Sequence, residues 1–250
     1  MITHNSTPVR SEPTRQPTGR IALGVAVPIL GMMGLLAIGI WNRPERFGSW
    51  HANPMMDAQF TYQGLTFLLA LAFWGVLAIL FPAALRKYAR VGDVAAPAQP
   101  VRWLGIKPGE SWRSVGTSFA VIMLVVTFVY VFFGLLGGSL PPAASLAVLP
   151  WVLLFAVINA FVEETLSRLG VVVGLDGLLK PATIALISAL VFGLPHFLGS
   201  PGGPLGSLLA GFMGWMMAKS MIETRGFFWA WFIHFLLDIP ILFGLIVAAM

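Results

Sequence analysis

The chain contains no cysteine and few charged residues, and both shortages exclude classes of protein. Without cysteine there is no disulfide, no cysteine nucleophile and no thiolate metal site. Only 10% of the 250 residues are charged, against about 25% in an average soluble domain. With 58% apolar residues, a chain of this length cannot cover its apolar surface with a charged shell. The composition therefore excludes an ordinary soluble enzyme and a disordered chain, and it predicts a membrane protein.

Several signatures of known enzyme classes are also missing. The chain has no His-Glu-x-x-His zinc motif, no Gly-x-Ser-Gly nucleophile and no glycine loop of the phosphate-binding or dinucleotide-binding type. No pair of aspartates is spaced for an intramembrane aspartyl mechanism. The net charge of +5 predicts basic cytoplasmic loops and no nucleic-acid partner, because Lys and Arg on short loops set the topology of membrane proteins.

Seven apolar runs follow an N-terminal segment, residues 1–20, which we expect to be a disordered cytoplasmic tail. Each run has roughly the 17–25 residues that cross a bilayer core. Backbone groups in lipid must be paired within their own segment, so each run is predicted to be a helix. The expected fold is all-α, a multi-pass transmembrane bundle of seven or eight helices with a polar site inside it. The runs cover about 21–41, 60–85, 115–137, 146–175, 182–198, 205–222 and 226–249.

The polar segments predict the topology. Residues 21–140 are expected to form N-terminal membrane helices with a basic loop at 86–113, which carries six Lys or Arg. Lys and Arg are more frequent in alternate polar segments, and the positive-inside rule then places the N-terminus in the cytoplasm. We expect a multi-pass protein of the cell membrane, and the absence of cysteine and the modest size suit a prokaryotic one.

Small and aromatic residues suggest where helices pack and where the membrane surface lies. Three glycines of the sixth run are predicted to allow close helix packing: Gly206, Gly211 and Gly214. Four tryptophans are predicted to be interfacial anchors: Trp41, Trp103, Trp112 and Trp151.

Only nine of the 25 charged residues follow Arg113, and several of these lie inside apolar runs. A charge at the centre of a membrane helix costs about 3 kcal/mol on insertion scales, so such residues usually face a polar cavity or a partner. Glu164 and Arg168 are four residues apart, on one helical face, which predicts an ion pair. His234 and Asp238 have the same spacing and can converge on one point. The intramembrane polar residues are Glu163, Glu164, Arg168, His196, His234 and Asp238.

The fourth and fifth runs are expected to form an antiparallel hairpin around a turn at 176–181. Glu163 and His196 are equally far from this turn in sequence, so both should lie about 25 Å below it, given the rise of 1.5 Å per residue. The spacing predicts that these two side chains meet within the bilayer. Phe192 shares a helical face with His196 and should pack beside the imidazole. His234 is only about eight residues into its run and is expected nearer the cytoplasmic side.

Three motifs in this order resemble one family: Glu163-Glu164-x-x-x-Arg168, Phe192-x-x-x-His196 and His234-x-x-x-Asp238. The pattern is similar to that of the CPBP family of CAAX proteases and bacteriocin-processing enzymes, also called the ABI family. The resemblance covers about residues 145–245 and implies an intramembrane endopeptidase. Members of the family include the enzymes that remove the last three residues from prenylated CAAX proteins. The last motif position is often Asn in the family and is Asp238 here.

The resemblance implies a catalytic membrane core at residues 141–250. Its catalytic residues would be Glu163, His196, His234 and Asp238, supported by Glu164, Arg168 and Phe192. Glu163 with His196 can activate water and protonate the leaving amine. His234 can donate to the oxyanion, with Asp238 orienting it.

A second mechanism uses a metal. Glu163, His196, His234 and Asp238 are also a plausible ligand set for zinc, with water in an open position and Glu164 as the base. Asp238 in place of an amide favours this version, but the sequence leaves the metal and metal-free mechanisms both open.

Other functions of the same scaffold also remain open. The expected partners are membrane lipid and a peptide or lipidated-protein substrate. One alternative is a bacteriocin-immunity or scaffold protein on the same fold without proteolysis. Another is a small transporter that uses the polar cluster as a proton or cation relay. The chain shows no internal repeat, which weighs against a transporter built from repeats.

Overall fold

The described residues of the computed structural model, 18–42, 53–199 and 201–250, form a helical bundle. Seven of their helices are long and apolar enough to cross a membrane. The prediction of an all-α multi-pass bundle is therefore confirmed. The predicted tail lies outside the described residues except for its last three, with which the first helix begins. The spans are Thr18–Trp41, Met55–Leu80, Trp112–Leu135, Ala143–Leu175, Pro181–Leu198, Gly203–Thr224 and Phe228–Ala248.

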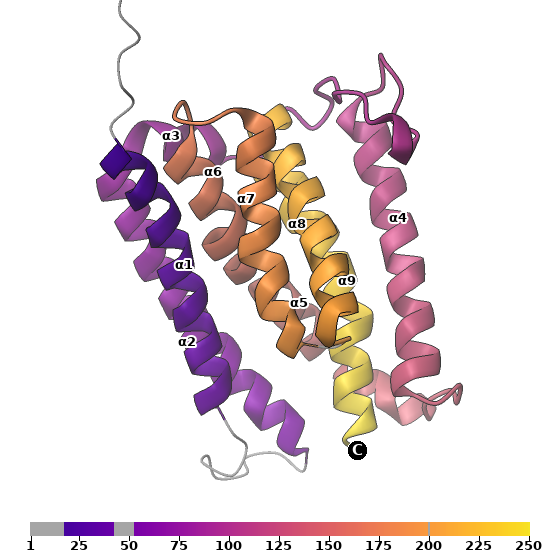
Figure 1. Ribbon diagram of the computed structural model, residues 1–250. Helices are drawn as coiled ribbons and strands as arrows, with labels where there is room; N and C mark the ends of the chain where they lie inside the picture. The colour runs from indigo at the N-terminus through magenta and orange to yellow at the C-terminus, as the bar shows by residue number, and fades with distance from the viewer. Residues whose placement is uncertain (1–17, 43–52, 200) are drawn as a thin grey trace, which may run out of the picture.

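The helices run side by side (Figure 1). The segment from Glu164 to Leu175 is buried among them. Helices α1 (Thr18–Trp41) and α2 (Pro54–Leu80) form one flank, and α4 (Trp112–Tyr130) forms the other. The short helix α3 (Pro82–Tyr88) lies at the end of the bundle where α1 begins, and Met250 lies at the opposite end. The remaining helices are α5 (Leu149–Glu163), α6 (Gly170–Leu175), α7 (Pro181–Gly193), α8 (Gly203–Thr224) and α9 (Phe228–Ala248).

The fourth span stays continuous where the sequence left room for a break. Between α5 and α6 the chain forms a π-helical segment, Glu164–Leu169, whose six residues are all buried. A π-helical turn inside an α-helix changes the direction of side chains and is frequent at functional sites. The count of spans is therefore seven, and the widened turn contains two of the motif residues, Glu164 and Arg168.

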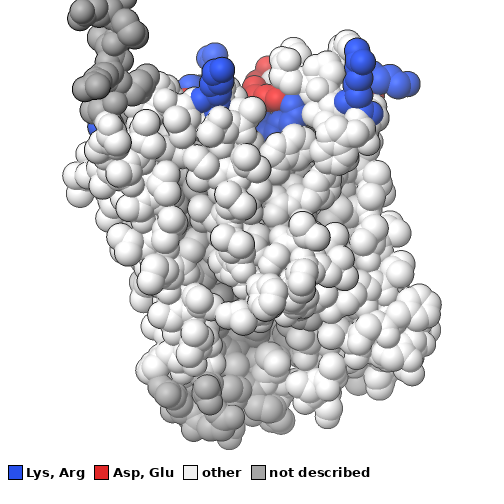
Figure 2. All heavy atoms as spheres, in the orientation of Figure 1, with Lys and Arg blue, Asp and Glu red and all other residues white. Residues whose placement is uncertain are grey.

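Basic side chains gather at one end of the bundle (Figure 2). This end carries α3 and the loop at 86–113, and the loop lies over the turn between α8 and α9. The backbone N–H of Phe227 donates to the carbonyl of Arg90, and Trp229 Nε1 donates to the carbonyl of Val94. The loop therefore packs against the start of α9, where Phe227 and Phe228 are only partly exposed and Trp229 is buried.

The same loop overturns one of the four predictions for tryptophan. Trp112 is fully buried, and its Nε1 donates to Glu223 Oε2 at 2.8 Å. The prediction that Trp112 is an interfacial anchor is therefore wrong, because the loop folds back over the start of α4. Trp41, Trp103 and Trp151 are exposed, as the prediction requires.

Close helix packing at a small residue is confirmed for Gly214, where a Cβ atom would lie 3.1 Å from the Ser188 carbonyl oxygen of α7. A Cβ atom at Gly211 would make an ordinary contact with α7, 3.4 Å from the Ala189 carbonyl oxygen. At Gly206 the nearest atom is the carbonyl oxygen of Pro201, in the turn just before α8, so this glycine permits a tight turn. The tightest crossing between distant helices joins α1 to α6. There a Cβ atom at Gly24 would lie 2.3 Å from the carbonyl oxygen of Gly174. Glycine thus lets two backbones touch at this crossing.

Replacing Gly24 by valine is expected to lower the thermal stability of the purified protein. The side chain would meet backbone atoms that cannot move aside, and overpacking of this kind costs about 1–3 kcal/mol. Thermal unfolding in detergent measures the effect. Gly64→Val is the matched control, because nothing lies within 4 Å of a Cβ atom at Gly64. Equal melting temperatures for the two variants would contradict the close crossing.

Candidate active site

A cavity of about 540 Å³ lies inside the bundle, between α2, α4, α5, α8, α9 and the end of the α7 span. The four predicted catalytic residues line it, Glu163, His196, His234 and Asp238, together with Phe192 of the second motif. They come from three separate spans, so the fold brings together side chains that are up to 75 positions apart in the sequence. Apolar side chains form most of the remaining wall.

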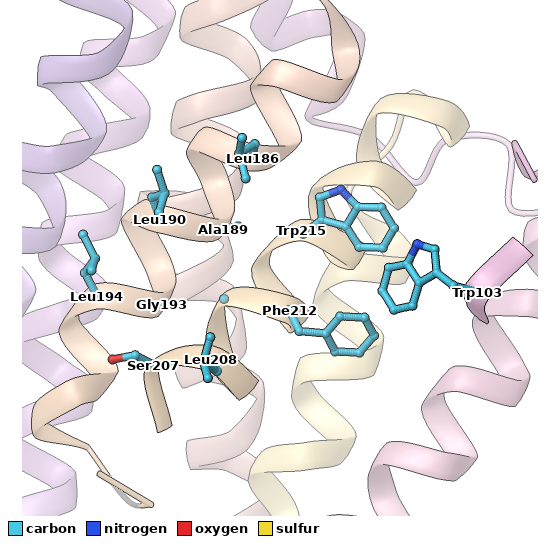
Figure 3. A pocket seen from close by; sticks show the side chains of 11 residues that line it. Trp103, Leu186, Ala189, Leu190, Gly193, Leu194, Ser207, Leu208, Phe212 and Trp215 are labelled. Carbon is cyan, nitrogen blue, oxygen red and sulfur yellow. The ribbon is translucent and has the colours of Figure 1, made fainter. Parts of the chain in front are cut away.

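A second hollow, of about 440 Å³, lies on the outside of the α7–α8 pair (Figure 3). Figure 3 shows the rings of Trp103, Phe212 and Trp215 on one side of it and three leucines of the α7 span on the other. Its described lining contains no acidic, basic or histidine side chain. Without such groups this hollow offers no acid–base chemistry, so the cavity that contains Glu163 is the candidate active site.

The predicted ion pair between Glu164 and Arg168 is present and fully buried. Arg168 Nη1 lies 3.0 Å from Glu164 Oε1, and neither side chain has any exposed surface. The guanidinium also lies over the ring of Phe192, 3.4 Å from its centroid. Such a stacked cation is stabilised by the ring quadrupole. Arg168 therefore connects the first motif to the second.

Glu164 also connects the first motif to the third. His234 Nδ1 lies 2.6 Å from Glu164 Oε1, and a carboxylate oxygen can only accept, so the proton lies on Nδ1. The other ring nitrogen, Nε2, lies 3.6 Å from Glu163 Oε2 and 3.6 Å from Asp238 Oδ1. Both distances exceed a direct hydrogen bond. Glu164 thus fixes the ring so that Nε2 faces two further carboxylates.

The expected displacement of His234 towards one side of the membrane is wrong. Its ring contacts Glu164 directly. The expectation for His234 assumes that the last run starts at the membrane surface. Helix α9 instead begins beneath the 86–113 loop, so a residue early in α9 already lies at the depth of Glu164.

His196 lies just beyond α7, in the 3₁₀ segment Leu194–Leu198. Its Nδ1 lies 2.7 Å from the Phe192 carbonyl oxygen, which only accepts, so Nδ1 carries a proton and Nε2 of the neutral ring is an acceptor. The ring centroids of Phe192 and His196 lie 4.3 Å apart, which confirms the predicted packing of Phe192 beside the imidazole. Glu163 and His196 face the same cavity, and no hydrogen bond joins them among the described contacts.

The residues do not fit a metal site in this arrangement. Within the described part of the chain, no group of three or more His, Asp or Glu side chains is placed to hold a metal ion. The Nδ1 atoms are engaged, at His234 with Glu164 and at His196 with the Phe192 carbonyl, which leaves Nε2 of each ring as the nitrogen that could bind another group. The zinc ligand set inferred from the sequence stays a prediction.

Several residues of the cavity were not predicted from the sequence. Gln59, Tyr62 and Gln63 of α2 line it, although the first 140 residues contain no recognisable motif. Asn159, one turn before Glu163, donates to Glu163 Oε1 at 3.3 Å and to Asp238 Oδ2 at 3.1 Å. An amide inside an apolar run, four residues before a motif carboxylate, is the signal that could have identified it.

Residues 145–240 match the family described as type II CAAX prenyl endopeptidase Rce1-like. Comparisons with curated proteins and with solved structures find no match. The matched segment begins before α5 and ends within α9, so it contains all three motifs. The match covers less than half of the chain and is consistent with the CPBP resemblance: over this segment the chain is similar to the Rce1-like CAAX protease family. Seven of the described helices are long and apolar enough to cross a membrane.

Proposed function

We propose that this chain is an intramembrane endopeptidase that hydrolyses peptide bonds of membrane-associated or lipidated proteins or peptides. One observation carries the proposal: Glu163, His196, His234 and Asp238 line a single cavity within the Rce1-like segment. Two carboxylates and two histidines in an apolar enclosure are groups that acid–base hydrolysis can use.

Glu163 and His196 activate the attacking water in this proposal. His196 offers an unprotonated Nε2, because its Nδ1–H is held by the Phe192 carbonyl. The water oxygen bonds to the peptide carbonyl carbon as its proton moves to one of these two bases. The C–N bond then breaks, and that proton passes to the leaving amine.

His234 stabilises the oxyanion. Its Nδ1–H is engaged with Glu164, so only a proton on Nε2 can reach the cavity, and the ring must then be an imidazolium. Three carboxylates flank the ring, and this arrangement of charge stabilises a cation there. An N–H donor fixed before the reaction stabilises developing negative charge at little reorganisation cost.

The architecture of the cavity supports a substrate that arrives from the bilayer. Its lining includes Leu205 and Leu209 of α8, which are 60% and 46% exposed. The cavity therefore reaches the outer surface of the bundle, where lipid chains lie. Membrane lipid and a lipid-associated peptide are the partners that we propose.

The concentration of Lys and Arg at one end supports an orientation (Figure 2). We propose that this end faces the cytoplasm, in accordance with the positive-inside rule. The start of α1 lies at the same end (Figure 1), so the N-terminus would be cytoplasmic.

The proposed mechanism belongs to the glutamate type and needs no metal. Treatment of the purified protein with a chelator should leave its cleavage rate unchanged, because no group of three or more His, Asp or Glu side chains among the described residues is placed to hold a metal ion. Elemental analysis of the same sample should show no stoichiometric zinc. Loss of cleavage in the chelator, with recovery on adding zinc, would contradict the metal-free mechanism.

Cleavage of a defined peptide tests the CAAX-type activity. The purified protein is reconstituted into vesicles with an internally quenched peptide that ends in a farnesylated CAAX sequence, and with the same peptide lacking the prenyl group. We expect wild type to cleave the farnesylated peptide and Glu163→Ala to be inactive. Glu110→Ala, in the loop outside the cavity, is the control and should retain activity. No cleavage by folded wild type would contradict the CAAX-type assignment.

A further inference from the structure

Asn159 is the one amide that joins two of the motif carboxylates among the described contacts. Its Nδ2 donates to Glu163 Oε1 at 3.3 Å and to Asp238 Oδ2 at 3.1 Å. An amide group carries two N–H donors on this nitrogen, so one side chain can serve both acceptors. Asn159 therefore bridges α5 to α9 across the base of the cavity.

The bridge determines which oxygen of each carboxylate faces His234. Asn159 donates hydrogen bonds to Oε1 of Glu163 and to Oδ2 of Asp238. The remaining oxygens, Glu163 Oε2 and Asp238 Oδ1, are the two that lie 3.6 Å from His234 Nε2. Asn159, Glu163, His234 and Asp238 thus form a closed ring of side chains, in which each carboxylate has one oxygen on the amide and one towards the imidazole.

The charge of the ring explains why an amide suits this position. Glu163 and Asp238 carry like charges and face the same ring nitrogen, so they repel each other. A neutral group with two donors holds both carboxylates without adding charge, whereas an acid would add a third negative charge. An ionised Asp238 cannot donate, whereas the amide of Asn159 supplies N–H groups to both carboxylates.

We infer that Asn159 is a positioning residue for the hydrolysis, because it holds Glu163 and Asp238 in the orientation that the reaction uses. The inference rests on the proposed function. It assigns to α5 a second functional residue beside Glu163, and this residue lies outside the three motifs. It also makes Asp238 part of a matched amide–carboxylate pair, so the identities of residues 159 and 238 should depend on each other.

Steady-state cleavage of the farnesylated peptide tests the positioning role. Asn159→Ala should lower kcat by about 10–100-fold, the usual effect of removing a group that orients functional side chains, with little change in KM. Asn159→Asp should be less active still, because it adds a third carboxylate to the ring. Val157→Ala, on the lipid-exposed side of the same helix, is the control and should retain wild-type kcat.

Exchange of the two side chains distinguishes positioning from simple packing. The double variant Asn159→Asp/Asp238→Asn restores one amide and one carboxylate, each on the other helix. We expect its kcat to exceed that of Asn159→Asp alone. A kcat for Asn159→Ala equal to that of the control, or a double variant no more active than Asn159→Asp, would overturn the inference.

A measurement without substrate separates failure of the inference from failure of the proposed function. Melting temperatures are compared for Asn159→Ala, Asp238→Ala and the double variant Asn159→Ala/Asp238→Ala. Bridged residues are coupled, so the double variant should lose less stability than the sum of the single losses. Additive losses would overturn the bridge even in an active enzyme. If wild type shows no Glu163-dependent cleavage, the proposed function and the catalytic role of Asn159 both fail, whereas measured coupling would still establish the bridge.

Discussion

Replacing Glu163 by glutamine is expected to lower the cleavage rate by about 10²–10⁴-fold, the usual contribution of a positioned acid–base group. Glutamine keeps the size of the side chain and can still contact Asn159, but it cannot take a proton from water. The loss should therefore appear in kcat and leave the melting temperature close to that of wild type. His196→Ala should cause a comparable loss, because it removes the free Nε2 acceptor.

The controls for this prediction lie outside the cavity. Glu110→Gln makes the same chemical change in the 86–113 loop and should retain wild-type kcat. Both cavity variants should elute from a sizing column as wild type does, which shows that they fold. If Glu163→Gln retained the rate of Glu110→Gln, Glu163 would not act in the chemistry and the proposed mechanism would be wrong.

Replacing Arg168 by methionine is expected to destabilise the fold by about 3–5 kcal/mol, the cost of leaving one partner of a buried ion pair uncompensated. The substitution leaves Glu164 without its cationic partner, although Glu164 has no exposed surface and also contacts His234. It further removes the cation that stacks on Phe192. Thermal unfolding, together with the yield of folded protein, measures the effect.

A second substitution separates the lost pair from lost packing. The double variant Arg168→Met/Glu164→Gln removes the stranded charge, so it should be more stable than Arg168→Met alone. Lys180→Met, in the turn before α7, removes a cation at the end of the bundle and should melt with wild type. An Arg168→Met protein as stable as the Lys180→Met protein would show that the buried pair does not stabilise this fold.

Local spacing was enough to predict part of the structure. Run length and apolarity predicted seven or eight spans, of which seven are present, because a bilayer fixes the length of a helix and requires its backbone to be paired internally. The four-residue spacing of Glu164 and Arg168 predicted an ion pair that is present. Phe192 was expected beside His196 for the same reason, and their rings are in contact. These features depend on neighbours along one helix.

Features that depend on packing between distant segments were not predicted. The π-helical turn at Glu164–Leu169 leaves no mark on the hydrophobic pattern. Trp112 was expected at the membrane surface, and His234 was expected at a shallower depth. The fold of one polar loop over the start of α4 and the α8–α9 turn accounts for both errors. The bridge from Asn159 to Asp238 depends on how α5 packs against α9.

The central claim is that this chain cleaves membrane proteins through Glu163, and a comparison of protein termini tests it without knowledge of the substrate. Native cells carrying wild type or Glu163→Ala, at matched expression, are compared by mass spectrometry of the N- and C-terminal peptides of their membrane proteins. We predict termini that occur only with wild type, and these would also identify the substrate. Identical termini in the two cell lines would contradict the protease assignment and would favour an immunity or scaffold role on the same fold.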